Sequence, residues 1–393
     1  MTLIQKPYFI EATDIEVPVS FRQQPMNGRM RVMYRRSFLY GGLGTLAACT
    51  QSEEPSQVTT AVERHQWRMV TSWPPNFPGH GISANRLARR LGELSGGRLE
   101  VDVFATGELV PGLEVLDAVS RGAVQMGHSA PVYWRGMIPA AQIFGSVPFG
   151  MLPNEFNAWL YFGGGLELWR EAYAPLRVIP FLAGNTGAQM GGWFNREINS
   201  VEDLTGLKIR IPGLGGDVMK RAGALPVQIE PSEIFTALQT GVIDATEWVG
   251  PYNDMTMALH EVAEYYYYPG WQEPSGALEC LVSMNAYETL SDELKLILKT
   301  VCMAENDYLL AEFNARNRRA WKNLVEDHGV QLRRFPDDVL QTLRRFSIEV
   351  MEDLAAENPM SGRVYESYKT FATEIGAWLK ITEGSITEAR GSL

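Results

Sequence analysis

Strand-like and helix-like segments alternate along the first two thirds of this chain, and that alternation constrains its fold more than any other feature. Residues 99–104 alternate apolar and polar side chains, as a half-exposed strand does. The preceding segment, 81–94, carries Leu87, Leu91 and Leu94 at helical spacing and stops at two glycines. Strands that alternate with helices predict parallel sheets with helical cover. We therefore predict an α/β protein.

The chain is too long for one ordinary hydrophobic core. It has 393 residues, and the same rhythm recurs in a strand at 207–211, a helix near 217–222 and a strand at 242–245. No linker rich in Pro or Ser separates the two stretches. We predict two lobes joined by crossing strands, with a ligand cleft between them. The predicted division gives 66–187 with about 275–320 to lobe 1, and 188–274 with about 321–393 to lobe 2.

The last third of the chain is helical in pattern. A Ser-Asp-Glu cap at 291–293 opens a helical segment that runs to about residue 328, just before Gly329. Nearly forty residues is long for a globular helix. It is expected to bridge both lobes, to protrude, or to pack on another subunit. Two further helices are predicted at about 337–357 and 361–380.

The N-terminal segment has the features of an export signal. Arg35 and Arg36 precede a short, Gly-rich apolar stretch that closes with Leu-Ala-Ala-Cys at Cys49. The paired arginines are typical of a twin-arginine signal, and the closing residues resemble a bacterial lipobox. The stretch is too short to be a permanent membrane span. We predict a leader at 1–48, a lipid on Cys49 and a polar tether at 49–65, which together predict a lipid-anchored periplasmic protein.

Charge and cysteine content narrow the functional classes. A net charge of −11 argues against nucleic acid as a partner. It leaves open an anionic small ligand, because a local basic group can dominate a sheltered site. Cys280 and Cys302 are more simply explained as buried free thiols than as a disulfide.

Several enzyme signatures are incomplete. Residues 127–131 approximate a nucleophile elbow but end in proline, and no partner residues for a triad stand out. Residues 213–216 follow a strand but lack the third glycine of a dinucleotide fingerprint. The five histidines have no zinc-binding spacing. We predict no catalytic residues and no enzyme.

Three places carry polar groups where a ligand could bind. Arg210 lies in an apolar strand, either at a solvated edge or turned into a cleft, where a guanidinium would match a carboxylate. Glu247, beside Trp248, follows the next strand and is a surface pair, a structural acid or an oxygen ligand for a hard cation. Gln189 offers a neutral oxygen in a Gly-rich crossing segment.

Together, residues 122–128, 204–213 and 237–245 resemble the solute-binding subunits of tripartite ATP-independent periplasmic (TRAP) transporters. The Leu-x-Gly-x-Lys-x-Arg part of the second segment is the most specific. The resemblance covers most of residues 66–335. It implies the two-lobed periplasmic solute-binding fold, with an interlobe cleft and long C-terminal helices.

The resemblance also implies the residue roles. Arg210 would bind the substrate carboxylate, and the Glu247-Trp248 pair is similar to the branch that takes small 2-oxo acids with a bound cation. Gln189, Glu247 and the main-chain oxygen of Trp248 would hold Na⁺ or Ca²⁺. That branch is described as dimeric through an elongated C-terminal helix, for which the segment from Ser291 is the candidate.

The function implied is capture of a small organic acid, a 2-oxo acid such as pyruvate or a related 2-hydroxy monocarboxylate, and its delivery to a membrane permease. A metal-dependent lyase or hydrolase with Glu247 as its base is the rival hypothesis. A structural lipoprotein is the third, and it predicts no stabilisation by any ligand.

Overall fold

The structure, a computed structural model, describes residues 63–391. The predicted leader, Cys49 and nearly all of the predicted tether lie outside the described residues. Within residues 63–391, every helix is too short or too polar to cross a membrane. Residues 63–391 form the folded body of the protein.

The first sheet has five strands, in the order β2-β1-β3-β10-β4. Strands β1, β2 and β3 are mutually parallel, whereas β10 is antiparallel to both β3 and β4. The strands are β1 (His65–Thr71), β2 (Leu99–Phe104), β3 (Met126–Ser129), β4 (Val178–Asn185) and β10 (Ala277–Ser283).

The second sheet has six strands, in the order β11-β9-β5-β8-β6-β7. It is parallel except for β5, which is antiparallel to β8 and β9. The strands are β5 (Gly192–Phe194), β6 (Lys208–Arg210), β7 (Leu225–Val227), β8 (Ala245–Thr246), β9 (Tyr265–Tyr268) and β11 (Gln331–Arg334).

The chain passes between the sheets twice in this region, at residues 186–191 and 269–276. The antiparallel member of each sheet, β5 or β10, is the strand that follows such a crossing. A strand that arrives from the other sheet need not share the direction that the local strand–helix units impose. The predicted α/β class with two sheets joined by crossing strands is confirmed.

Shorter helices cover the sheets. In α1 (His80–Leu94), the apolar residues at helical spacing are buried, as its sequence pattern predicts, except that Leu94 is exposed. The other helices of the body up to the long helix are α2 (Val115–Ser120), α3 (Ala141–Gly145), α4 (Pro153–Phe162), α5 (Gly165–Tyr173), α6 (Gly213–Arg221), α7 (Ile234–Gln239), α8 (Pro251–Thr256) and α9 (Met284–Glu288).

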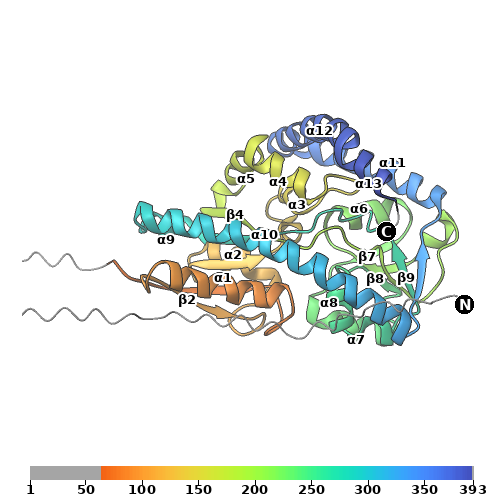
Figure 1. The fold of residues 1–393 in the computed structure, drawn as a ribbon, viewed down its shortest axis with the longest axis horizontal. Coiled ribbons are helices and arrows are strands. Elements are labelled where there is room, and N and C mark those ends of the chain that lie inside the picture. Colours follow the sequence, from red (N-terminus) through yellow and green to blue (C-terminus); the bar gives the residue numbers. More distant parts are fainter. Residues whose placement is uncertain (1–62, 392–393) are drawn as a thin grey trace, which may run out of the picture. The chain divides into compact units, whose positions relative to one another are not determined.

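The long helix predicted from Ser291 is α10 (Asp292–Lys322), followed by a π-helical turn, Asn323–Asp327. The Ser291 hydroxyl accepts a hydrogen bond from the Leu294 amide at 3.4 Å, which confirms the predicted cap. The helix packs on β4 and α1 beside the first sheet and on α8 beside the second (Figure 1). The expectation that this helix bridges both parts of the protein is therefore confirmed, and packing on another subunit stays a prediction.

The C-terminal helices also contact both parts of the body. Helix α11 (Asp337–Glu357) packs on α6, and α12 (Pro359–Leu379) packs on α4 and α5. A π-helical turn and α13 (Ser385–Arg390) follow. The assignment of each helix to one lobe or the other stays a prediction.

Cys280 on β10 and Cys302 on α10 are both buried free thiols, as the sequence favours. Beside them in β10, Glu279 is fully buried and accepts hydrogen bonds from the Tyr173 hydroxyl at 3.1 Å and from the Trp134 indole. Burial raises the pKa of Glu279 to about 8, although both hydrogen bonds oppose the shift. The carboxyl therefore holds its proton in the folded protein at neutral pH.

Glu279 should make folding stability depend on pH. Its ordinary pKa is 4.5, so the folded state binds more protons than the unfolded state between pH 4.5 and about pH 8, and stability falls as pH rises through that window. The slope is at most about 1.4 kcal/mol per pH unit. Glu279→Gln removes this pH dependence. Chemical denaturation should therefore show the free energy of unfolding of the variant rising relative to that of the parent protein from pH 5 to pH 8. The exposed Glu93→Gln is the control, and a pH-independent difference for Glu279→Gln would contradict the assignment.

Candidate ligand and cation site

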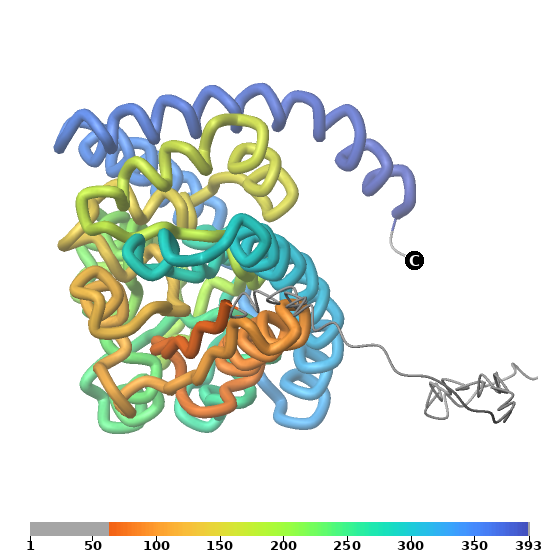
Figure 2. Tube along the Cα trace, turned by 90° about the vertical axis from the view of Figure 1, so that its left-hand side faces the viewer, coloured from red at the N-terminus to blue at the C-terminus, as the bar shows by residue number. Residues whose placement is uncertain are grey.

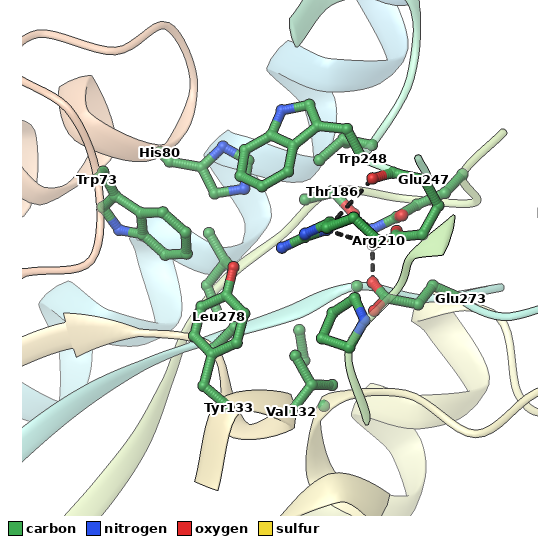
Figure 3. A pocket seen from close by; sticks show the side chains of 17 residues that line it. Trp73, His80, Val132, Tyr133, Thr186, Arg210, Glu247, Trp248, Glu273 and Leu278 are labelled. Carbon is green, nitrogen blue, oxygen red and sulfur yellow. Dashed lines mark hydrogen bonds and ion pairs between the residues drawn. The ribbon is translucent and has the colours of Figure 1, made fainter. Parts of the chain in front are cut away.

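A small cavity of about 30 Å³ lies between the two sheets, and residues of both line it (Figure 3). Its lining includes the carboxyl ends of β6 and β8 and both crossing segments. Carboxyl ends of parallel strands are where open α/β sheets place their ligands. The polar groups around it come from His80, Tyr133, Thr186, Gln189, Arg210, Glu247, Trp248 and Glu273.

Arg210 is the last residue of β6 and is only 1% exposed. Its Nη1 donates to the Glu247 carboxylate and, at 3.2 Å, to the Glu247 carbonyl, while its guanidinium lies 5.3 Å from the centre of the Trp248 ring. Its Nη2 is buried without a hydrogen-bond partner. Figure 3 shows that end of the side chain directed into the cavity, near the Tyr133 hydroxyl. A buried cationic donor with a free N–H is suited to an anionic ligand.

Glu247 directly follows β8, and its amide donates to the Arg210 carbonyl at 3.1 Å, which holds the two residues side by side. Its carboxyl is 1% exposed. Burial raises the pKa of Glu247 well above its ordinary value, and the Arg210 guanidinium opposes this shift. Of the three interpretations of the Glu247-Trp248 pair, a surface pair is excluded.

Gln189 and Glu273 come from the two crossing segments and meet at the cavity. The Gln189 Nε2 donates to the Glu273 carboxylate at 2.7 Å and to the Thr186 hydroxyl at 3.1 Å. This leaves the Gln189 Oε1, which is buried, without a partner. Burial raises the pKa of Glu273 to about 7, against the opposing effects of Arg210 and of the hydrogen bond from Gln189.

The donor set fits a hard cation. Gln189 supplies an unpartnered amide oxygen, Glu247 and Glu273 supply carboxylates, and Trp248 has a main-chain oxygen. Oxygen ligands of this kind suit Na⁺ or Ca²⁺, whereas zinc prefers thiolate and imidazole. Across residues 63–391, His, Cys, Asp and Glu side chains form no metal-type group of three or more. A cation here would therefore depend on neutral oxygens beside the two carboxylates.

Aromatic rings make the opposite wall. The His80 imidazole lies 4.5 Å from Trp73 and 5.7 Å from Trp248, centre to centre. Burial lowers the pKa of His80 to about 3, so the ring is neutral. Burial likewise raises the pKa of Tyr133 to about 12, so the phenol keeps its proton. This wall can shield a short apolar tail from water while offering neutral polar atoms.

The structure brings together all four of the predicted binding residues, Gln189, Arg210, Glu247 and Trp248, at one cavity. Sequence analysis missed His80, Tyr133 and Glu273. Glu273 had a detectable signal, because it lies between Gly270 and Gly276 in a crossing segment that resembles the one holding Gln189. The other two lie on elements whose local sequence gives no sign of the cavity.

The incomplete enzyme motifs have structural explanations. Ser129, the residue that would be the elbow nucleophile, is buried in β3 and hydrogen-bonds to the Ser72 hydroxyl at 2.6 Å. The glycine run begins α6 at Gly213, four residues before the predicted start. Gly213 has φ +60°, and a Cβ there would lie 3.2 Å from Val132. The glycine permits close contact between elements beside the two sheets.

A cleft between two α/β lobes, with crossing segments and a free guanidinium nitrogen inside, defines a solute-binding protein of the two-lobed class. Residues 69–358 match the family of bacterial extracellular solute-binding proteins, family 7. The chain belongs to this family, and the resemblance to TRAP solute-binding proteins drawn from its motifs is confirmed.

Three relatives are especially similar. The chain is 44% identical over 339 residues (86% of this chain, 92% of the relative) to a monocarboxylate 2-oxoacid-binding periplasmic protein of Nostoc sp.. A TRAP solute-binding protein of Pseudoalteromonas atlantica, solved with bound sodium and pyruvate, is 38% identical with a TM-score of 0.81, covering 83% of this chain and 99% of that one. One from Bordetella bronchiseptica, a dimer with calcium and picolinate in one active site, is 36% identical with a TM-score of 0.81, covering 82% and 96%.

Proposed function

We propose that this protein is the periplasmic solute-binding subunit of a TRAP transporter. It captures a small 2-oxo acid such as pyruvate, or a related 2-hydroxy monocarboxylate, together with Na⁺ or Ca²⁺, and delivers the acid to a membrane permease. The observation that carries this proposal is the free Nη2 of Arg210 in a small cavity that also holds an unpartnered amide oxygen and two carboxyl groups. The relatives that bind 2-oxo acids, or pyruvate with a cation, support the same ligand class.

We assign the site as follows. The Arg210 guanidinium binds the ligand carboxylate. The oxygens of Gln189, Glu247 and Trp248 hold the cation, and the position of Glu273 supports it as a further oxygen ligand. When bound, the cation neutralises the carboxylates that would otherwise repel the acid.

The size of the cavity supports a small ligand. One water needs about 10–15 Å³ by the same kind of measure, so a cavity of about 30 Å³ excludes a large ligand. Entry requires the two lobes to separate, since residues of both close the cavity. A ligand that touches both lobes then favours the closed state by its differential affinity.

A thermal-shift screen of monocarboxylates, each with Na⁺, Ca²⁺ or a chelator, tests the function. Stabilisation by a short 2-oxo or 2-hydroxy acid that needs a cation is the expected result, and no stabilisation by any acid would refute it. The same mixtures, recovered after long incubation, should contain the acid unchanged. Conversion of the acid would instead favour the metal-dependent lyase or hydrolase.

Dimerisation is proposed through the C-terminal helices rather than the helix from Ser291, because α10 is packed along the body. Figure 2 shows the last helix running out beyond the others. Trp378 at the end of α12, Ile381 in the π-helical turn and Ile386 in α13 are 58%, 69% and 64% exposed, which supports an apolar contact with a second copy. The molar mass by light scattering, with and without residues 380–393, measures this. Twin-arginine export and a lipid on Cys49 stay predictions from the sequence.

A further inference from the structure

Asp254 is a buried carboxylate that the site described above does not use. It lies in α8, six residues after Trp248, and is 1% exposed. Four donors surround it. Its Oδ1 accepts from the amides of Val249 at 3.2 Å and Gly250 at 2.9 Å, and its Oδ2 accepts from the Trp193 indole at 2.9 Å and the Tyr266 hydroxyl at 2.6 Å.

The bond from Val249 has a geometric consequence for Trp248. The Val249 N–H belongs to the same peptide unit as the Trp248 carbonyl. That unit is planar and trans, so its N–H and C=O point in opposite directions. Fixing the N–H on Asp254 therefore turns the Trp248 oxygen to the face of the loop away from that carboxylate. The same bond polarises the peptide and increases the negative charge on the oxygen.

Hydrogen bonds also hold the rest of the loop between β8 and α8, residues 247–250. The Glu247 amide donates to the Arg210 carbonyl at 3.1 Å, and the Val249 carbonyl accepts from the Met190 amide at 3.0 Å. The Glu247 carbonyl accepts from the Arg210 guanidinium at 3.2 Å and from the Thr246 hydroxyl at 2.8 Å. The peptide between Trp248 and Val249 is instead oriented by the side chain of Asp254.

The Oδ2 partners lock the carboxylate itself. Trp193 on β5 and Tyr266 on β9 stack with their ring centres 4.0 Å apart, and each donates to Oδ2. A carboxylate with four donors has little freedom to rotate. Its two oxygens have separate tasks, since Oδ2 anchors it to the second sheet and Oδ1 faces the loop.

We infer that Asp254 is the positioning residue of the cation site, which aims the main-chain oxygen of Trp248 at the cation through the Val249 amide. This rests on the proposed function, in which that oxygen is a cation ligand. Partners behind metal ligands fix ligand orientation and raise ligand basicity, and their loss typically lowers metal affinity 10- to 100-fold. A purely structural role, capping the start of α8, would lower stability and leave cation affinity unchanged.

The test compares Asp254→Asn with Tyr266→Phe in the whole chain. Asn keeps the size but loses the charge and sets an amide N–H against the Trp193 indole. Phe removes one donor to Oδ2 and leaves the loop contacts in place. Calorimetric titration with Ca²⁺ alone, supported by Tb³⁺ luminescence sensitised by tryptophan, should show affinity reduced by about 10- to 100-fold in Asp254→Asn. Tyr266→Phe should stay within about threefold of the parent protein while melting at a lower temperature.

The outcomes separate the two proposals. A parent protein that binds no cation would overturn the inference together with the cation part of the proposed function. A parent protein that binds Ca²⁺, with Asp254→Asn binding equally well, would overturn the inference alone. If Asp254→Asn does not fold, hydrogen exchange on the parent protein replaces it. The Val249 and Gly250 amides must be protected before cation is added, and rapid exchange there would overturn the inference.

Discussion

Replacing Arg210 by alanine should lower the affinity for pyruvate about a thousandfold. The guanidinium is buried, and its Nη2 is the free donor in the cavity. Removing one partner of a buried charge pair costs on the order of 3–5 kcal/mol, and each 1.4 kcal/mol is about tenfold in affinity. Alanine also removes the cation that opposes the rise in the pKa values of the Glu247 and Glu273 carboxyls.

Isothermal titration of pyruvate, with Na⁺ or Ca²⁺ present, measures the effect. Arg210→Lys keeps the charge but loses the planar fork, so its affinity should lie between those of the parent protein and Arg210→Ala. Arg333→Ala is the matched control, because Arg333 lies on β11 of the same sheet and pairs with Glu197 at the surface. If folded Arg210→Ala binds pyruvate nearly as well as the parent protein does, the carboxylate is held elsewhere.

The local sequence pattern predicted those elements whose formation depends on neighbouring residues alone. The alternation at 99–104 and the leucines of 81–94 predicted β2 and α1, because burial of one face follows the strand and helix periods. Arg210 was identifiable because a charge at the end of an apolar strand needs a partner. The structure supplies that partner in Glu247, which directly follows β8, the strand next to β6 in the sheet.

The remaining part of the site depends on tertiary arrangement. Glu273 reaches Gln189 only because two crossing segments, 84 positions apart in sequence at these residues, run together. His80 and Tyr133 face the cavity through the way α1 and the turn after β3 pack, and no sequence period encodes that. For the same reason the helix from Ser291 had three possible placements. Its length was visible in the sequence, but its packing on β4 and α1 beside the first sheet and on α8 beside the second was not.

The glycines show how one pattern can have two physical causes. A Gly-rich turn between a strand and a helix fits a phosphate-binding loop and a tight packing contact equally well. At Gly216, in the run at 213–216, an added Cβ would lie 2.7 Å from the Ile211 carbonyl oxygen, so the glycine is required by the tight turn from β6 into α6. The missing third glycine argued against a dinucleotide site in the sequence, and the structure supplies a packing reason for the glycine that is present.

Replacing Glu247 by glutamine should abolish most of the cation dependence of ligand binding. In the parent protein, the Glu247 carboxyl lines the cavity, and in its ionised form, the form that ligates a cation, it faces the anionic ligand. Two unit charges 4 Å apart interact by about 4 kcal/mol at an effective dielectric constant of 20. A cation between them removes that repulsion, so a chelator should weaken pyruvate binding to the parent protein on the order of a hundredfold or more.

Glutamine keeps the shape and an oxygen but carries no charge. In the variant, Arg210 no longer pairs with a carboxylate at position 247, so its charge is available to the ligand. Metal-stripped Glu247→Gln should therefore bind pyruvate more tightly than the metal-stripped parent protein. With Ca²⁺ present the order should reverse, because the variant has lost a carboxylate ligand. Titration of pyruvate into each protein, with Ca²⁺ and with chelator, gives the four affinities. The exposed Glu197→Gln is the control for loss of one negative charge on the same sheet. If the metal-stripped and metal-loaded parent proteins bind pyruvate equally well, the hypothesis of a cation at this site is refuted, whatever the variant does.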